Sequence, residues 1–209
     1  TFNDNSPLYF RDLPIERFLA VVDECGCSIT GQTSELAPAD RKLYALRDVT
    51  GTVPSIPLIA ASIMSKKLAE GAAALVLDVK CGNGAFMHTP QEARRLGRTM
   101  VAIGTRMGRR MSALVTDMNQ PLGRAAGNAV EVAESIAALR GEGPDDLMQV
   151  TLALGARMLV LAGRVADDEA ARAELQTRLD SGEALETLRR MVDCHGGDTA
   201  VIDDPGRLA

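Results

Sequence analysis

The chain has 209 residues, of which 46% are hydrophobic and 24% are charged, and its formal net charge is −5. A chain of this length can bury a hydrophobic core, and the composition is that of a soluble globular protein. Aromatic residues make up only 3% and tryptophan is absent, so the core has to be aliphatic. The acidic balance argues against a nucleic-acid partner, because nucleic-acid-binding domains carry basic patches.

Membrane and metal sites are also disfavoured by the sequence. No apolar stretch approaches the ~20 residues that cross a bilayer, and the N-terminus has no signal pattern. We therefore expect a cytoplasmic protein with no membrane partner. The four cysteines form no C-x-x-C pair, and the two histidines, His88 and His195, do not have zinc-ligand spacing. Four reduced thiols are expected.

The N-terminal third is predicted to be irregular at first and then helical. Residues 1–14 are polar, contain two prolines and predict an irregular lead-in. Apolar periodicity then predicts helices over residues 15–24, 38–46 and 55–70. In the third helix Ser55 suits the N-cap, and Pro57 falls in the first turn, where its missing N–H costs nothing.

The middle of the chain predicts alternating strands and helices. Residues 73–79, AALVLDV, form a continuous apolar run that predicts a strand buried on both faces. A glycine-rich turn and a helix over residues 90–107 follow. A second strand over residues 111–116 and a helix over residues 128–140 repeat the pattern. Such units in series predict an α/β fold with a parallel sheet flanked by helices.

The C-terminal third is predicted to be largely helical. After Pro144 the candidate helices are residues 145–161, 167–179 and 183–192. Residues 194–209 are rich in glycine and aspartate and predict an exit linker. Residues 15–193 are thus predicted to be one α/β domain.

The turn after the first strand is a candidate site by position. DVKCGNGAFM offers G-x-G without the third glycine of a dinucleotide fingerprint. A tight turn at the carboxyl end of a central strand is where open α/β sheets bind ligands, but taken alone the turn is better explained as an ordinary strand-to-helix connection. His88 follows this turn, and neither histidine supports a catalytic triad.

One face of the third helix carries mixed chemistry. Ile59, Ser62 and Lys66 are spaced i, i+3 and i+7, so they share a face, and Ser62 and Lys66 alone could simply mark its solvent edge. Arg47 could be a surface arginine or a partner of Asp48. If Arg47, Ser62 and Lys66 converge, two cations and a hydroxyl would suit a planar heterocycle with carbonyl oxygens and a ring N–H.

Three long segments resemble a known family. They read GQTSELAPADRKLYALRDVTGTVPSIPLIAASIMSKKLAEG, ALVLDVKCGNGAFM and TDMNQPLGRAAGNAVEV. Over residues 15–208 the chain is similar to the bacterial thymidine and pyrimidine-nucleoside phosphorylases. The resemblance implies a pentosyltransferase that converts a pyrimidine nucleoside and its co-substrate phosphate into the free base and a pentose 1-phosphate. It implies no required cofactor, and a homodimeric parent enzyme.

The resemblance also implies roles for individual residues. Arg47, Ser62 and Lys66 match the residues that hold the base, and Ile59 and Phe86 match apolar side chains that pack on it. Negative charge develops on the departing pyrimidine, so Arg47 and Lys66 would act catalytically by stabilising it. Ser62 would fix the orientation of the ring.

A monovalent-cation site is implied as well. Some family members bind potassium through backbone carbonyls and a carboxylate that match Leu122, Ala125 and Glu134. The alternative is that Glu134 is merely an exposed helical residue.

The sequence also departs from the family. Cys81 and Asn83 stand where Val or Thr and Ser are common. The family's N-terminal helical domain, phosphate-binding segment and C-terminal α/β domain have no counterpart here, so we expect this fragment to be impaired as an enzyme. Two alternatives stay open. One is a non-catalytic remnant or ligand-binding domain, and the other is a related pentosyltransferase acting on another base or a nucleotide.

Overall fold

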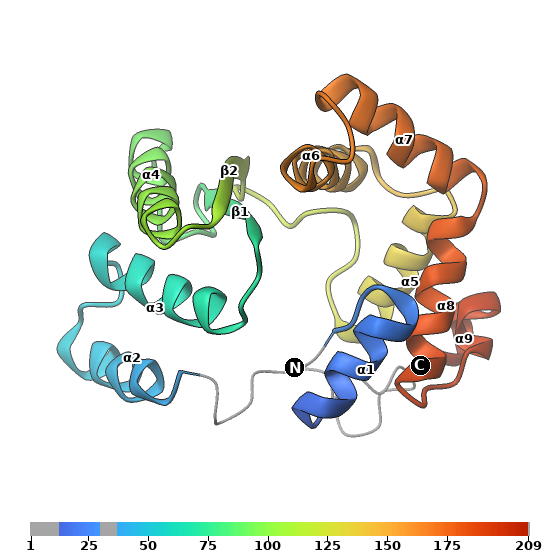
Figure 1. The fold of residues 1–209 in the computed structure, drawn as a ribbon, viewed down its shortest axis with the longest axis horizontal. Coiled ribbons are helices and arrows are strands. Elements are labelled where there is room, and N and C mark those ends of the chain that lie inside the picture. Colours follow the sequence, from blue (N-terminus) through green and yellow to red (C-terminus); the bar gives the residue numbers. More distant parts are fainter. Residues whose placement is uncertain (1–12, 30–36, 209) are drawn as a thin grey trace. The chain divides into compact units, whose positions relative to one another are not determined.

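Figure 1 shows a computed structural model of the chain, which describes residues 13–29 and 37–208. The predicted lead-in at residues 1–14 falls almost wholly outside the described residues. The elements are, in chain order, α1 (Ile15–Cys25), α2 (Pro38–Thr50), α3 (Ile56–Ala69), β1 (Ala74–Cys81), α4 (Pro90–Arg106), β2 (Arg110–Asp117), α5 (Asn128–Leu139), α6 (Asp145–Ala162), α7 (Asp168–Asp180), α8 (Glu183–Cys194), α9 (Ala200–Asp203) and the 3₁₀ helix η1 (Pro205–Leu208).

The described residues form two compact units, where the sequence predicted one domain. We call the first the helical unit; it contains α1, α5, α8, α9 and η1. We call the second the sheet unit; it contains α2, α3, β1, α4 and β2, together with residues 150–173 of the α6–α7 region. The domain boundaries of the complete protein stay a prediction.

Two parallel strands form the centre of the sheet unit. Ala74 of β1 lies opposite Arg110 of β2, and the pairing continues to Cys81 opposite Asp117. The crossover helix α4 packs against both strands, and α3 packs against α4 (Figure 1). This arrangement confirms the predicted α/β class with a parallel sheet flanked by helices. The predicted helical character of the C-terminal third is also confirmed.

Local sequence signals explain where α4 begins and how closely it packs. The Thr89 hydroxyl accepts a hydrogen bond from the Glu92 backbone N–H, and the Glu92 carboxylate accepts one from the Thr89 N–H, which completes a capping box. At Gly104 an added Cβ would lie 2.4 Å from Sδ of Met111. Glycine at this position therefore allows α4 to approach β2 closely.

Strand β1 buries only one face among the described residues. Leu77, Val79 and Cys81 are buried with α3 and α4, whereas Asp78 between them is exposed. The Asp78 carboxylate pairs with Lys80, with 2.7 Å between Oδ2 and Nζ, and accepts a hydrogen bond from the Thr116 hydroxyl. The prediction of a strand buried on both faces was therefore wrong. The second face carries a polar network instead.

The helical unit has its own aliphatic core. Its buried residues are Val21, Cys25, Ile136, Met191, Val192, Cys194, Val201 and Ile202. Helix α1 packs against α8, and α5 packs against η1. Val201 and Ile202 are 0% exposed, and the Arg140 guanidinium donates to the Ile202 carbonyl at 2.6 Å. The described part of the predicted exit linker is therefore packed into this core.

Two further predictions concern cysteines and membranes. All four cysteines are free thiols. In the described ranges, no helix combines the length and the hydropathy that crossing a bilayer requires.

Candidate functional site

The glycine-rich turn joins the carboxyl ends of the two strands. Beyond β1, the Gly84 N–H donates to the Met118 carbonyl at 2.9 Å, and the Asn83 N–H donates to the Asn119 side-chain oxygen at 3.1 Å. The Met118 N–H donates in turn to the Cys81 carbonyl at 2.7 Å. These bonds fix the edge of the sheet at which parallel α/β sheets bind ligands.

Gly82 is required by this close approach. Its φ is +136°, a conformation that side-chain-bearing residues rarely adopt, and an added Cβ would lie 2.8 Å from the Asn119 backbone nitrogen. The first glycine of the turn therefore allows two backbone segments to touch. This is a geometric role that needs no dinucleotide.

A hollow of about 660 Å³ opens beside the turn. It is lined by Pro54, Ile59, Ile63, Asp78, Val79, Lys80, Asn83, Gly84, Ala85, Phe86, Met87, His88, Leu96, Met100 and Met118. Ile59 is buried in its wall, whereas the Phe86 side chain is 59% exposed. The structure thus brings the two predicted base-packing residues to one mostly apolar hollow.

Arg47 is buried at the junction of α2 and α3. Its guanidinium donates to the carbonyls of Val53 and Leu58, the latter at 3.4 Å, and lies 5.0 Å from the centre of the Tyr44 ring. Among the described residues, none accepts a hydrogen bond from its buried Nε. Arg47 therefore stabilises the α2–α3 connection through two of its donors, while its Nε has no acceptor among the described residues.

Ser62 and Lys66 lie one turn apart on α3. The Lys66 ammonium is 3.1 Å from Oδ2 of Asp40 on α2, with about a quarter of its side chain exposed. Ser62 is buried, and its backbone carbonyl accepts a hydrogen bond from the Ser65 hydroxyl at 3.1 Å. The adjacent Lys67 has a different environment, because it pairs with Glu70 at 2.9 Å on an exposed surface.

The predicted base-binding set is divided between two places in the sheet unit. Arg47 and Lys66 lie on the packed pair α2 and α3, whereas Ile59 and Phe86 line the hollow. Arg47, Ser62 and Lys66 are not among the residues that line this hollow. Convergence of the three polar side chains on one ligand therefore stays a prediction.

Lys80 and His88 are among the four polar residues of the hollow that were not selected from the sequence as site residues; the others are Asp78 and Asn83. Lys80 ends the polar network of β1, with its ammonium 3.0 Å from the Thr116 hydroxyl. His88 has Nδ1 3.3 Å from the Gly82 carbonyl. In the sequence, the only indication that Lys80 and His88 belong to a site was their position immediately before and shortly after the glycine-rich turn. His195 lies elsewhere, buried in the helical unit with Nε2 3.1 Å from the Ser28 hydroxyl.

The predicted cation ligands lie around one loop of the helical unit. Glu134 accepts a hydrogen bond from the Arg124 N–H at 2.8 Å, and Asp146 accepts one from the Gly123 N–H at 3.0 Å. The Gly123 N–H bond, followed by that of Leu147, lowers the pKa of the Asp146 carboxyl. Two carboxylates thus clamp the loop that contains Leu122 and Ala125.

The predicted cation site at this loop would rely on oxygen ligands. In the part of the chain that the structure describes, no cluster of three or more His, Cys, Asp or Glu side chains could hold a metal ion. Carbonyl oxygens of Leu122 and Ala125 with the Glu134 carboxylate would suit a hard cation. Since one oxygen of Glu134 already accepts from Arg124, the potassium site stays a prediction.

Comparison with known proteins assigns the chain, with its parallel sheet and its hollow at the strand ends, to a family. Residues 11–185 match the model of the glycosyl transferase family, a/b domain, and the chain belongs to this family. Proteins named pyrimidine-nucleoside phosphorylase from Staphylococcus aureus strains bovine RF122 / ET3-1, USA300 and NCTC 8325 / PS 47 are each 54% identical to it over 191 residues. The aligned region covers 91% of this chain and 44% of each relative, so the chain spans less than half of their length.

Proposed function

We propose that the complete protein phosphorolyses pyrimidine nucleosides, converting thymidine and phosphate into thymine and 2-deoxyribose 1-phosphate. A phosphate oxygen attacks the anomeric carbon, the bond from that carbon to the ring nitrogen breaks, and its electron pair leaves with the base. The observation that carries the proposal is the 54% identity, over 91% of the chain, to proteins named pyrimidine-nucleoside phosphorylase.

The base would be bound from α3 and its neighbours. Arg47 and Lys66 would stabilise the negative charge of the departing pyrimidine, and Ser62 would orient its ring. Ile59 and Phe86 would pack on the ring faces. The buried Nε of Arg47, which no described residue accepts as a hydrogen-bond donor, supports a polar ligand at this junction. Lys66 can maintain its ion pair with Asp40 and still donate a hydrogen bond to a ligand, because an ammonium group has three N–H donors.

The remaining parts of the proposal concern phosphate, potassium, assembly and location. Phosphate is the co-substrate, and a potassium ion held by Leu122, Ala125 and Glu134 would stabilise the loop that Asp146 also clamps. The complete enzyme is proposed to be a cytoplasmic homodimer.

Product analysis tests the reaction itself. Complete protein incubated with thymidine and inorganic phosphate should yield thymine and 2-deoxyribose 1-phosphate in equal amounts, as followed by phosphorus NMR. No thymine should appear when phosphate is omitted. Thymine release without phosphate would instead indicate hydrolysis and would refute the proposal.

The two alternatives predict other products. A ligand-binding remnant would bind thymine in calorimetry without turning thymidine over. A related pentosyltransferase would cleave a nucleoside monophosphate in preference to thymidine in a substrate panel.

A further inference from the structure

Lys80 is held at the edge of the hollow by two neighbouring side chains. Its ammonium lies 2.7 Å from Oδ2 of Asp78 and 3.0 Å from the hydroxyl of Thr116, which is its partner in the strand register. The Thr116 hydroxyl donates in turn to the other oxygen of Asp78. The three groups therefore form a closed cycle of hydrogen bonds that joins β1 to β2.

This cycle orders the Lys80 ammonium without using all of its donors. An ammonium group has three N–H donors, of which Asp78 and Thr116 accept two. Ordering a flexible lysine side chain costs free energy when it binds a ligand, and the two bonds reduce this cost because they already restrict Lys80. Lys80 is therefore a preorganised cation beside the hollow.

The backbone of the glycine-rich turn does not supply a comparable group. Glycine-rich loops bind phosphate when their backbone N–H groups point at the ligand. In this turn the N–H groups of residues 82–85 all donate to acceptors within the protein. Those of Gly82 and Ala85 donate inside the turn, at 3.0 Å each, and the two between them donate to the segment after β2. The turn is therefore not a phosphate loop, although its position and its glycines suit one.

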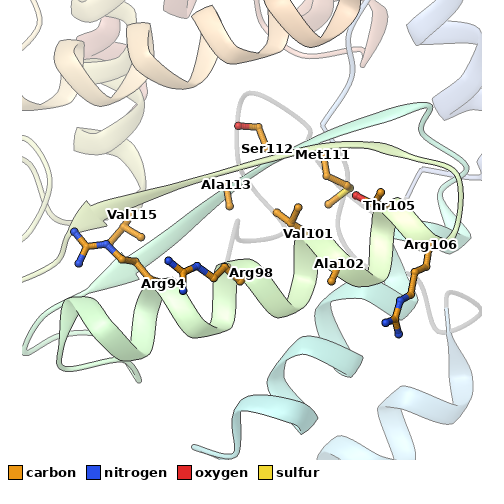
Figure 2. Close-up of a pocket in the computed structure, with 11 residues that line it drawn as sticks. Arg94, Arg98, Val101, Ala102, Thr105, Arg106, Met111, Ser112, Ala113 and Val115 are labelled. Atoms are coloured by element: carbon orange, nitrogen blue, oxygen red, sulfur yellow. The ribbon is translucent and has the colours of Figure 1, made fainter.

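Lys80 is also the only lysine or arginine among the described residues that line the hollow. Arg94 and Arg98 line a separate concavity between α4 and β2 (Figure 2), which shares no lining residue with the hollow. The whole chain has a formal net charge of −5, so an anionic substrate depends on local positive charge. Lys80 supplies such a charge in the hollow.

We propose that Lys80 binds an oxygen of the co-substrate phosphate, and that Thr116 is a positioning residue that orients the Lys80 ammonium. This assignment rests on the proposed function, because it takes phosphate to be the co-substrate. Lys80 would bind phosphate as a compact point charge and would exchange no proton with it. Ile59 and Phe86 line the same hollow, so phosphate and base would lie together, as attack on the anomeric carbon requires.

Two other roles for Lys80 predict different measurements. A contact to the base or the sugar would change the KM for thymidine rather than the KM for phosphate. A purely structural ion pair, with Asp78 or with another part of the complete protein, would contribute to stability and would leave both KM values unchanged.

Calorimetric titration of inorganic phosphate into the complete protein tests the assignment. Lys80→Gln should weaken phosphate binding by at least about tenfold, because it removes a charge-assisted contact. Thr116→Val should weaken it by about threefold, and Thr116→Ser should restore it, because serine keeps the hydroxyl that orients Lys80. The matched control Lys67→Gln makes the same change in net charge at a lysine that pairs with exposed Glu70, and should leave the Kd unchanged. Circular dichroism verifies that the variants fold.

Initial rates of thymidine cleavage give a second readout. Lys80→Gln should raise the KM for phosphate by at least about tenfold and leave the KM for thymidine within about twofold. The assignment would be overturned by equal phosphate affinities of the wild type and Lys80→Gln, by an equal loss in Lys67→Gln, or by no phosphate binding at all. A change confined to the KM for thymidine would overturn it as well.

The titration also separates this assignment from the proposed function, because it needs no turnover. A complete protein that binds phosphate through Lys80 and cleaves no thymidine would support the Lys80 contact and refute phosphorolysis alone.

Discussion

At the scale of single residues, Arg47 has a structural task beside its proposed catalytic one. Its guanidinium bonds to the carbonyls of Val53 and Leu58 at the α2–α3 junction, where the side chain is only 5% exposed. A buried group with these bonds contributes to folding. Replacing Arg47 by alanine should therefore carry a stability cost in addition to any effect on turnover.

Arg47→Ala should lower the free energy of unfolding by roughly 2 kcal/mol, since hydrogen bonds from a charged group contribute about 1.5–3 kcal/mol. Urea denaturation followed by circular dichroism measures the change. Arg41→Ala, an exposed arginine on the same helix, should change it by less than about 0.5 kcal/mol. Equal unfolding midpoints for the wild type and Arg47→Ala would show that the junction does not need this guanidinium.

Gly82 gives a second test at this scale. Gly82→Ala should destabilise the sheet unit by about 2–3 kcal/mol, because strain at a positive φ is combined with a 2.8 Å contact to the backbone of Asn119. Gly71→Ala is the matched control, since Gly71 has a φ of +78° and nothing within 4 Å of the added Cβ. Its cost should be about 1–2 kcal/mol from the backbone alone. Similar unfolding curves for the two variants would refute the close approach at Gly82.

At the scale of elements, the loop before α5 depends on carboxylates. Backbone hydrogen bonds, that from Gly123 first, lower the pKa of Asp146 in the folded state. A lowered folded pKa means that the folded chain binds the proton less readily than the unfolded chain. The Asp146 contribution is therefore present above the ordinary aspartate range and is lost as the pH falls through the lowered folded pKa.

Asp146→Ala should accordingly be less stable than the wild type at pH 7, and the difference should shrink below about pH 4. Urea denaturation across this pH range measures it. The exposed neighbour Asp145 controls for a carboxylate in the first turn of α6, so Asp145→Ala should not reproduce this pH-dependent difference. A wild-type advantage that stays constant from pH 7 to pH 3 would refute the Asp146 clamp.

Most elements could be predicted because their signals are local. The predicted ranges of α1 and α5 lie within one residue of their observed ends, and the predicted range of α4 begins at residue 90, as observed. The predictions that failed concern residues whose environment is set by contacts with residues distant in the sequence. Asp78 is stabilised on the open face of β1 by Thr116 of β2, and Val201 is buried by side chains from α1, α5 and α8. No local pattern encodes such contacts.

The candidate site was predictable to a similar extent. The shared helix and spacing of Ile59, Ser62 and Lys66 followed from the sequence, since all three lie on α3. The Lys66–Asp40 pair and the bonds of Arg47 to backbone carbonyls did not, because they depend on how α2 packs against α3. His88 lines the hollow because it follows the glycine-rich turn. The geometry of that turn is fixed by Met118 and Asn119, which lie more than thirty residues away in the sequence.

At the scale of the whole molecule, the candidate site belongs to the sheet unit of an acidic chain. The hollow at the strand ends is lined by Ile59, Phe86, Lys80 and His88, among other residues. The chain corresponds to 44% of its curated relatives, so catalysis has to be measured on the complete protein. The central claim is that α3 belongs to a pyrimidine site.

The most direct test compares two adjacent lysines of α3. In the complete protein, Lys66→Gln should lower kcat/KM for phosphate-dependent thymidine cleavage by roughly a hundredfold, the cost of removing one preorganised charge donor. Lys67→Gln should leave it within about twofold, because Lys67 pairs with exposed Glu70. Equal kcat/KM values for the two variants would contradict the assignment of this helix face to the base.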